Sequence, residues 1–157
     1  MGVAVANVLV TDPAFQDSLD LTAAVAGNRI GVTGPTNLAA GASGNISLAI
    51  NTALAGSLAD TLGLGFASNA NGVAGLTGQA LAGGSVAITG AVYDLANAAV
   101  APALAFGNVR TGTVRTVGVS NATITDSAFQ DSLDVAATTT NANLALTNPG
   151  RIMAGAA

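Results

Sequence analysis

The chain has no cysteine, histidine, lysine, glutamate or tryptophan. Without Cys and His, the usual catalytic triads, thiol nucleophiles and zinc sites have no residues to form them. Without Lys, Schiff-base chemistry and the lysine-containing phosphate loop are excluded as well. All eight acidic residues are therefore Asp, and all four basic residues are Arg. We expect a protein that is not an enzyme and that needs no cofactor.

Charge and aromatic residues are scarce. Charged residues make up 8% of the sequence and aromatic residues 3%, namely four Phe and one Tyr. The net charge of −4 argues against nucleic-acid binding, which needs clustered basic side chains. A composition that is acidic, free of Lys and Cys, and rich in Thr, Asn and Gly is typical of exported or cell-surface bacterial proteins. We therefore expect an extracellular or cell-surface location.

Long apolar runs are also missing. The uncharged stretches 30–59 and 61–93 are interrupted by Gly, Asn, Ser and Thr, so neither predicts a membrane span. Residues 1–10 lack the basic start and the small-residue cleavage site of a signal peptide. If the protein is exported, we expect its targeting segment to lie outside this sequence.

The remaining composition favours short strands joined by turns. Half of the residues are hydrophobic, mostly Ala, Val and Leu, and 20 are Gly. Apolar and other residues alternate within 45–50, 62–67 and 86–92, and again at 30–32 and its repeat 144–146, as in half-buried strands. Turn-forming clusters follow at 34–37, 68–72 and 147–150. We predict an all-β fold of immunoglobulin-like antiparallel β-sandwich repeats, with a β-solenoid as the alternative.

An internal repeat is the strongest signal. The segment Thr11–Asp20 returns as Thr125–Asp134, and only Pro13 and Ser127 differ. Aligned without a gap at this offset of 114 residues, 2–43 and 116–157 share 18 of 42 positions. A period of this length exceeds the roughly 20–50 residues of solenoid coils and is close to one immunoglobulin-like domain. The repeating unit is therefore predicted to be a domain.

Several segments resemble a known family of repeats. Leu104–Thr113, with Phe-Gly-Asn-Val-Arg-Thr-Gly at its centre, followed by 117–121, is similar to the opening of ASPM–SPD-2–Hydin-type immunoglobulin-like repeats. It particularly resembles the choice-of-anchor D repeats of bacterial surface proteins. Residues 38–43, 62–69 and 86–93 follow in the family's order. The resemblance implies a multi-domain exported surface protein and brings no catalytic residues.

The repeat divides the chain unevenly. Residues 1–97 are predicted to form one immunoglobulin-like repeat that lacks its first strand segment. Residues 98–157 are predicted to form the first half of the next repeat, completed by a neighbouring unit or by continuing sequence. An incomplete sandwich leaves unpaired backbone groups and an open core, so we expect strand complementation. The expected partners are copies of the chain or adjacent repeats, with possible attachment to a cell surface or matrix.

Six of the eight acidic residues fall in the two copies of the repeated segment. These are Asp12, Asp17, Asp20, Asp126, Asp131 and Asp134. Grouped carboxylates could bind calcium, although their spacing matches no EF-hand loop. The alternative is a short turn capped by the first Asp of each copy, with the other carboxylates in solvent.

Taken together, these features predict a structural extracellular repeat protein of a filament, sheath or surface array. The alternative function is an adhesin stalk or a ligand-binding surface module.

Overall fold

The computed structural model describes residues 1–156, which form two compact units. Unit 1 comprises Met1–Thr52 and Leu58–Gly90, and unit 2 comprises Ala53–Ser57 and the residues from Ala91 onward. Unit 2 thus begins before the boundary expected at residue 98, because the backbones of Asp94 and Asn97 bond to the second repeat. The predicted all-β, antiparallel fold class is confirmed, and the described residues form neither an α-helix nor a β-solenoid.

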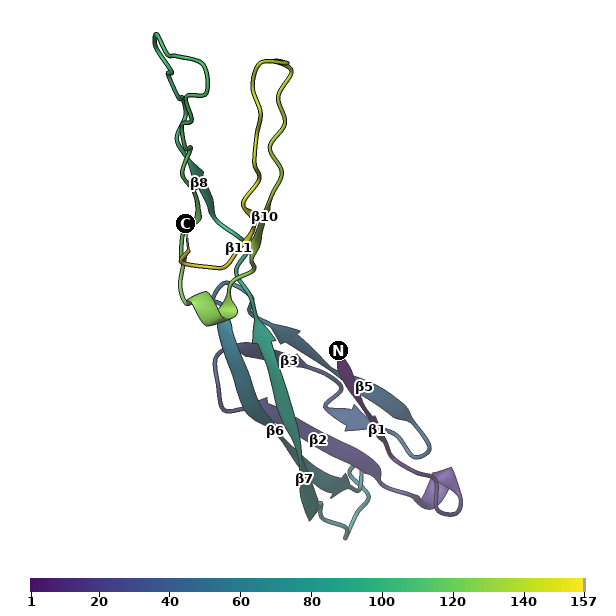
Figure 1. The fold of residues 1–157 in the computed structure, drawn as a ribbon. Coiled ribbons are helices and arrows are strands. Elements are labelled where there is room, and N and C mark those ends of the chain that lie inside the picture. The colour runs from purple at the N-terminus through teal and green to yellow at the C-terminus, as the bar shows by residue number, and fades with distance from the viewer. Residues whose placement is uncertain (157) are drawn as a thin grey trace. The chain divides into compact units, whose positions relative to one another are not determined.

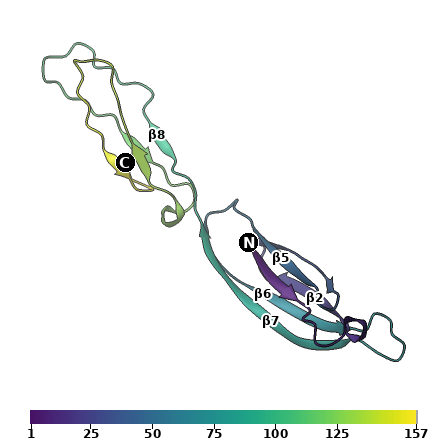
Figure 2. The ribbon, with the colours of Figure 1, turned by 90° about the vertical axis from the view of Figure 1, so that its right-hand side faces the viewer.

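Unit 1 is a sandwich of two antiparallel sheets (Figures 1 and 2). The first sheet has the strand order β1 (Gly2–Ala6), β5 (Ser43–Ile50) and β3 (Ile30–Thr33). The second has the order β4 (Asn37–Leu38), β2 (Ser18–Val25), β6 (Gly56–Asn69) and β7 (Gln79–Val92). β1 lies at an edge of its sheet and pairs only with β5 among the described strands.

The core of unit 1 lies between these sheets and follows the predicted alternation. Ile46 and Leu48 of β5 are buried, whereas Asn45 and Ser47, which alternate with them, are exposed; Leu62 of β6 is also buried. The buried cluster contains Leu21, Ile30, Ile46, Leu48, Leu58, Leu62 and Ile88. A fully buried Leu or Ile side chain contributes about 1.5–3 kcal/mol, so this cluster is the main source of unit 1 stability.

Unit 2 contains two small two-stranded sheets and long segments without strands. β8 (Ala98–Val100) pairs with β9 (Val119–Asn121), and β10 (Leu133–Val135) pairs with β11 (Gly150–Ile152). The strand expected at 144–146 is not formed. Its counterpart β3 is held by β5, and no strand lies against 144–146 within residues 1–156. Among the described residues, no helix is both long and apolar enough to cross a lipid bilayer.

The sequence repeat is also a structural repeat. In unit 1, Leu19 of β2 lies opposite Leu38 of β4; in unit 2, Leu133 lies opposite Ile152. Each copy places a single 3₁₀ turn before this ladder: η1 (Pro13–Phe15) and η2 (Ser127–Phe129). Pro13 and Ser127 both occupy the first position of that turn, where no backbone donor is needed. The one difference in the repeated segment therefore falls where either residue fits.

Candidate functional site: a duplicated asparagine–glutamine motif

Asn7, directly after β1, links three segments of unit 1 through its side chain. Its Nδ2 donates to the carbonyl oxygens of Asp17 (3.0 Å) and Leu38 (3.1 Å). Its Oδ1 accepts a hydrogen bond from Nε2 of Gln16 at 3.0 Å. A side-chain amide has both donors and acceptors, which is why Asn can join backbone groups of different segments.

Gln16 closes the loop between β1 and β2. Its Nε2 also donates to the carbonyl of Val8 at 2.9 Å, and its Oε1 accepts from the amide of Val10 at 2.9 Å. Within the same loop, the carboxylate of Asp12 accepts from the amide of Ala14 at 2.9 Å and caps η1. We call Asn7, Asp12, Phe15 and Gln16 the first asparagine–glutamine motif.

The second asparagine–glutamine motif, formed by Asn121, Asp126, Phe129 and Gln130, repeats these bonds in unit 2. Nδ2 of Asn121 donates to the carbonyls of Asp131 (2.9 Å) and Ile152 (3.4 Å), and its Oδ1 accepts from Gln130 (2.9 Å). Gln130 bonds the carbonyl of Ala122 and the amide of Ile124, each at 2.9 Å. Asp126 caps η2 through the amide of Ala128 at 2.9 Å. Every partner lies 114 residues from its counterpart in the first motif.

The two motifs differ in burial. Asn121 is 0% exposed and Gln130 is 7% exposed, whereas Asn7 and Gln16 are only half-buried. Phe129 is half-buried, whereas Phe15 is 88% exposed. Identical residues with the same internal bonds are therefore covered in one unit and open in the other.

The extended segment Tyr93–Val100, which we call the connecting segment, covers the second motif. The Tyr93 ring lies against Phe129, with ring centroids 5.7 Å apart. The amide of Asp94 donates to the carbonyl of Phe129 (2.8 Å), and the carbonyl of Asp94 accepts from the amide of Asp131 (3.0 Å). The carboxylate of Asp94 accepts from the hydroxyl of Thr125 at 2.5 Å.

The backbone groups of Asn97 bind the same segment to Asn121 and Ala122. Its amide donates to Oδ1 of Asn121 at 2.8 Å, and its carbonyl accepts from the amide of Ala122 at 2.9 Å. The next residues form β8 and pair antiparallel with β9, with Ala98 opposite Asn121 and Val100 opposite Val119. The second motif thus recognises an extended polypeptide, largely through its backbone.

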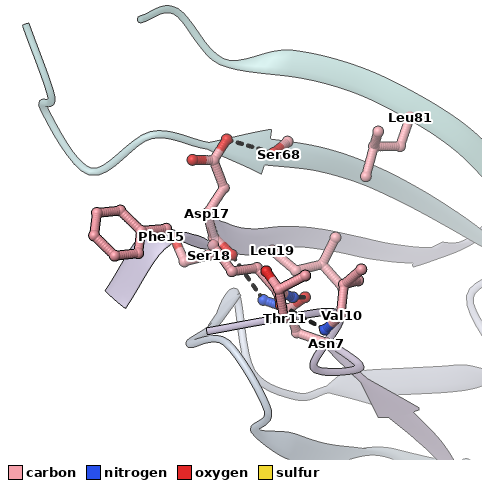
Figure 3. Close-up of a pocket in the computed structure, with 10 residues that line it drawn as sticks. Asn7, Val10, Thr11, Phe15, Asp17, Ser18, Leu19, Ser68 and Leu81 are labelled. Carbon is pink, nitrogen blue, oxygen red and sulfur yellow. Dashed lines mark hydrogen bonds between the residues drawn. The ribbon is translucent and has the colours of Figure 1, made fainter. Parts of the chain in front are cut away.

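The first motif borders an open pocket of about 390 Å³. Its lining residues include Asn7, Thr11, Phe15, Gln16 and Asp17 (Figure 3). The Phe15 ring projects away from the other lining residues. All of these positions belong to unit 1.

The six aspartates predicted as calcium candidates serve several different partners. Asp12 and Asp126 cap the two 3₁₀ turns. Asp17 accepts from the Ser68 hydroxyl at 2.6 Å, and Asp20 accepts from the side-chain amides of Asn37 (2.6 Å) and Asn69 (2.7 Å). Asp134 pairs with Arg151 at 3.1 Å, and Asp131 bonds the connecting segment through its backbone amide. Within residues 1–156, no three acidic side chains gather into a group able to hold a metal ion.

Comparison with protein-family models, curated proteins and solved structures finds no match. The site must therefore be interpreted from its own geometry. Its key residues are neutral amides, which a search for catalytic or metal-binding side chains passes over. The signal that could have found them is the identity of Asn7 with Asn121 and of Gln16 with Gln130 at the repeat offset.

Proposed function

We propose that this chain is a structural extracellular repeat protein whose sandwich units pack head to tail in a filament, sheath or surface array. One observation carries the proposal: the connecting segment that follows β7 is bound by the next copy of the motif. In this arrangement, each repeat binds the connecting segment that joins it to the preceding repeat. Such a link joins neighbouring repeats by hydrogen bonds and strand pairing, which an array under mechanical tension needs.

The chemistry of the motif supports a structural role. Its amide groups each bond to backbone groups of the same unit, which makes them positioning groups. Its Asp carboxylates cap the two 3₁₀ turns, and the neighbouring Asp17 binds the hydroxyl of Ser68. The sparse charge and the resemblance to bacterial surface repeats agree with a location outside the cell.

Immunogold electron microscopy on the producing cells, with antibodies against this chain, tests the proposal. We expect label on filaments, a sheath or the cell surface. The denatured mass of the labelled polypeptide then distinguishes a small subunit, near the 14.9 kDa of this chain, from a long tandem-repeat protein. Label confined to the cell interior would overturn the proposal.

A ligand-binding surface module or adhesin stalk is the second candidate, favoured by the open pocket beside the exposed Phe15. An array of glycans and surface proteins, probed with the chain and with Phe15→Ala, separates the two functions. Specific binding that is lost in Phe15→Ala would support the module. Binding that is equal for both chains, or absent, would count against it.

A further inference from the structure

We propose that the first asparagine–glutamine motif and the free edge of β1 form a docking site for the connecting segment of another repeat unit. This inference rests on the proposed function, because it names the contact through which repeats would join. Residues 1–156 contain two such motifs but one segment with the sequence of Tyr93–Val100. That segment is engaged in unit 2, so the occupant of the site in unit 1 must come from another repeat.

The groups that bind the connecting segment in unit 2 have open counterparts in unit 1. Phe129 corresponds to Phe15, and Asp131 corresponds to Asp17. In unit 2, the carbonyl of the Phe and the amide of the Asp bond to Asp94. In unit 1, neither the Phe15 carbonyl nor the Asp17 amide bonds to another described residue. Unit 1 therefore presents the same acceptor and donor without a partner.

The side-chain and strand-end contacts have counterparts as well. Thr125, which binds the Asp94 carboxylate, corresponds to Thr11. Ala122, whose amide binds the Asn97 carbonyl, corresponds to Val8, and the Val8 amide has no partner among residues 1–156. Thr11 also lines the open pocket, together with Asn7, Phe15 and Asp17. The pocket thus lies where the Tyr93–Asn97 part of a connecting segment would bind.

Strand β1 offers the matching edge. In unit 2, Asn121 exchanges backbone bonds with the 155–156 turn on one side of β9, and β8 pairs on the other side. In unit 1, Asn7 exchanges the same bonds with the 41–42 turn. The opposite side of β1 is the edge of its sheet. An added strand would extend this sheet by β-augmentation, as β8 pairs with β9.

The occupant is defined by chemistry as well as by shape. It needs an aromatic ring to cover Phe15 and a carboxylate one residue later for Thr11. It also needs a backbone N–H at the position of Asn97 to donate to Oδ1 of Asn7. Because the Asn97 side chain makes none of the bonds to the motif in unit 2, its identity should matter less than its N–H.

A peptide corresponding to Ala91–Ala101, labelled with fluorescein, provides the test. Its binding to the full chain is measured by fluorescence anisotropy. We expect saturable binding that Phe15→Ala weakens about 3- to 10-fold, the effect of losing one aromatic pair. Because Phe15 is 88% exposed, the variant should keep its fold, which far-UV circular dichroism verifies. A peptide with Asn97→Pro, which lacks the donating N–H, should bind at least ~10-fold more weakly.

Phe129→Ala is the matched control. It alters the same residue in unit 2 and should leave peptide affinity for unit 1 unchanged. Backbone NMR shifts on peptide addition should centre on the amides of Val8 and Asp17. Three results would overturn the inference: no binding up to millimolar peptide, binding unaffected by Asn97→Pro, or sensitivity to Phe129→Ala but not to Phe15→Ala. These outcomes do not depend on where the protein resides, so they are separate from the immunogold test.

Discussion

The side chain of Asn121 is hydrogen-bonded to several separate segments of unit 2. Its side chain bonds to the connecting segment, to Gln130, and to the carbonyls that precede β10 and end β11. The side chain is fully buried, so water cannot replace these partners when it is removed. An unsatisfied buried polar group costs about 1–3 kcal/mol, and several would be left at once.

We therefore predict that Asn121→Ala lowers the free energy of unfolding of unit 2 by about 2–4 kcal/mol. Tyr93, the one tyrosine in a chain without tryptophan, lies in the connecting segment and makes its fluorescence a reporter for unit 2. Urea unfolding followed at this residue measures the loss. Asn7→Ala, which removes the matching side chain from unit 1, is the control and should leave the Tyr93 transition in place. A shift below ~0.5 kcal/mol for Asn121→Ala would contradict the assigned role.

The pair Asp134–Arg151 illustrates the opposite case. The two residues lie opposite each other on β10 and β11, but their side chains are 73% and 67% exposed. Exposed ion pairs contribute about 0–1 kcal/mol. At the corresponding place in unit 1, Asn37 bonds to Asp20 without a charge on the Asn. The position needs a cross-strand donor more than a cation.

Replacing Arg151 by Asn should therefore change the unfolding free energy by less than about 0.5 kcal/mol. The same urea titration, run in low salt and in 1 M NaCl, measures the effect. The wild-type chain should show little dependence on salt at this pair, because solvent already screens it. A loss above 1 kcal/mol that disappears in high salt would mean that the ion pair matters more than its exposure implies.

At the scale of elements, the turn that follows β4 in unit 1 and β11 in unit 2 is tightly constrained. Gly41 has φ of +75°, and Gly155 at the same place in the second copy has φ of +76°. In each copy, the amide of this glycine donates to the carbonyl of the motif Asn, at 2.8 and 2.7 Å. The turn thus needs the left-handed conformation and cannot move away from the motif.

Gly155→Ala should destabilise unit 2 by about 1–2 kcal/mol, because Ala is strained at positive φ. A Cβ at this position would also meet the hydroxyl of Thr123 at 2.9 Å. At Gly41 the nearest atom is Cβ of Leu9 at 3.7 Å, an ordinary contact. Gly41→Ala should therefore cost unit 1 less, and hydrogen exchange of the β2 and β6 amides measures it. Equal losses for the two variants would show that conformation alone sets the cost.

Sequence patterns predicted unit 1 better than unit 2 for a physical reason. Alternation at 45–50 and 62–67 predicts strands correctly, because the strands that pair with β5 and β6 also lie in unit 1. The same pattern at 144–146 forms no strand, since a strand needs a partner as well as a propensity. Sequence patterns do not predict the motif, because the carboxylates are the conspicuous candidate ligands, whereas the fold uses the amides of Asn and Gln.

At the scale of the whole molecule, the 114-residue period has two structural consequences. It repeats a set of side-chain bonds within each unit, and it places the connecting segment N-terminal to the motif that binds it. We infer an assembly rule from this order: in each added repeat, the motif binds the connecting segment that precedes it.

This rule predicts the behaviour of a lengthened chain in which residues 2–115 are present twice before 116–157. Of the two sandwich copies, the second follows a connecting segment, so its Phe15 should be covered by the Tyr93 of the first. The amides of its Val8 and Asp17 should then bond to that segment and exchange with deuterium at least ~10-fold more slowly than those of the first copy. Hydrogen exchange read by NMR on segmentally labelled chains measures this difference.

The control is the same chain with Asn97→Pro in its first copy, which removes the N–H that the second motif binds. In that variant, the two copies should exchange at similar rates. Equal rates in the unmodified long chain would mean that docking of the connecting segment is peculiar to unit 2. Slow exchange in the second copy alone, abolished by the proline, would mean that each sandwich is locked to the chain before it.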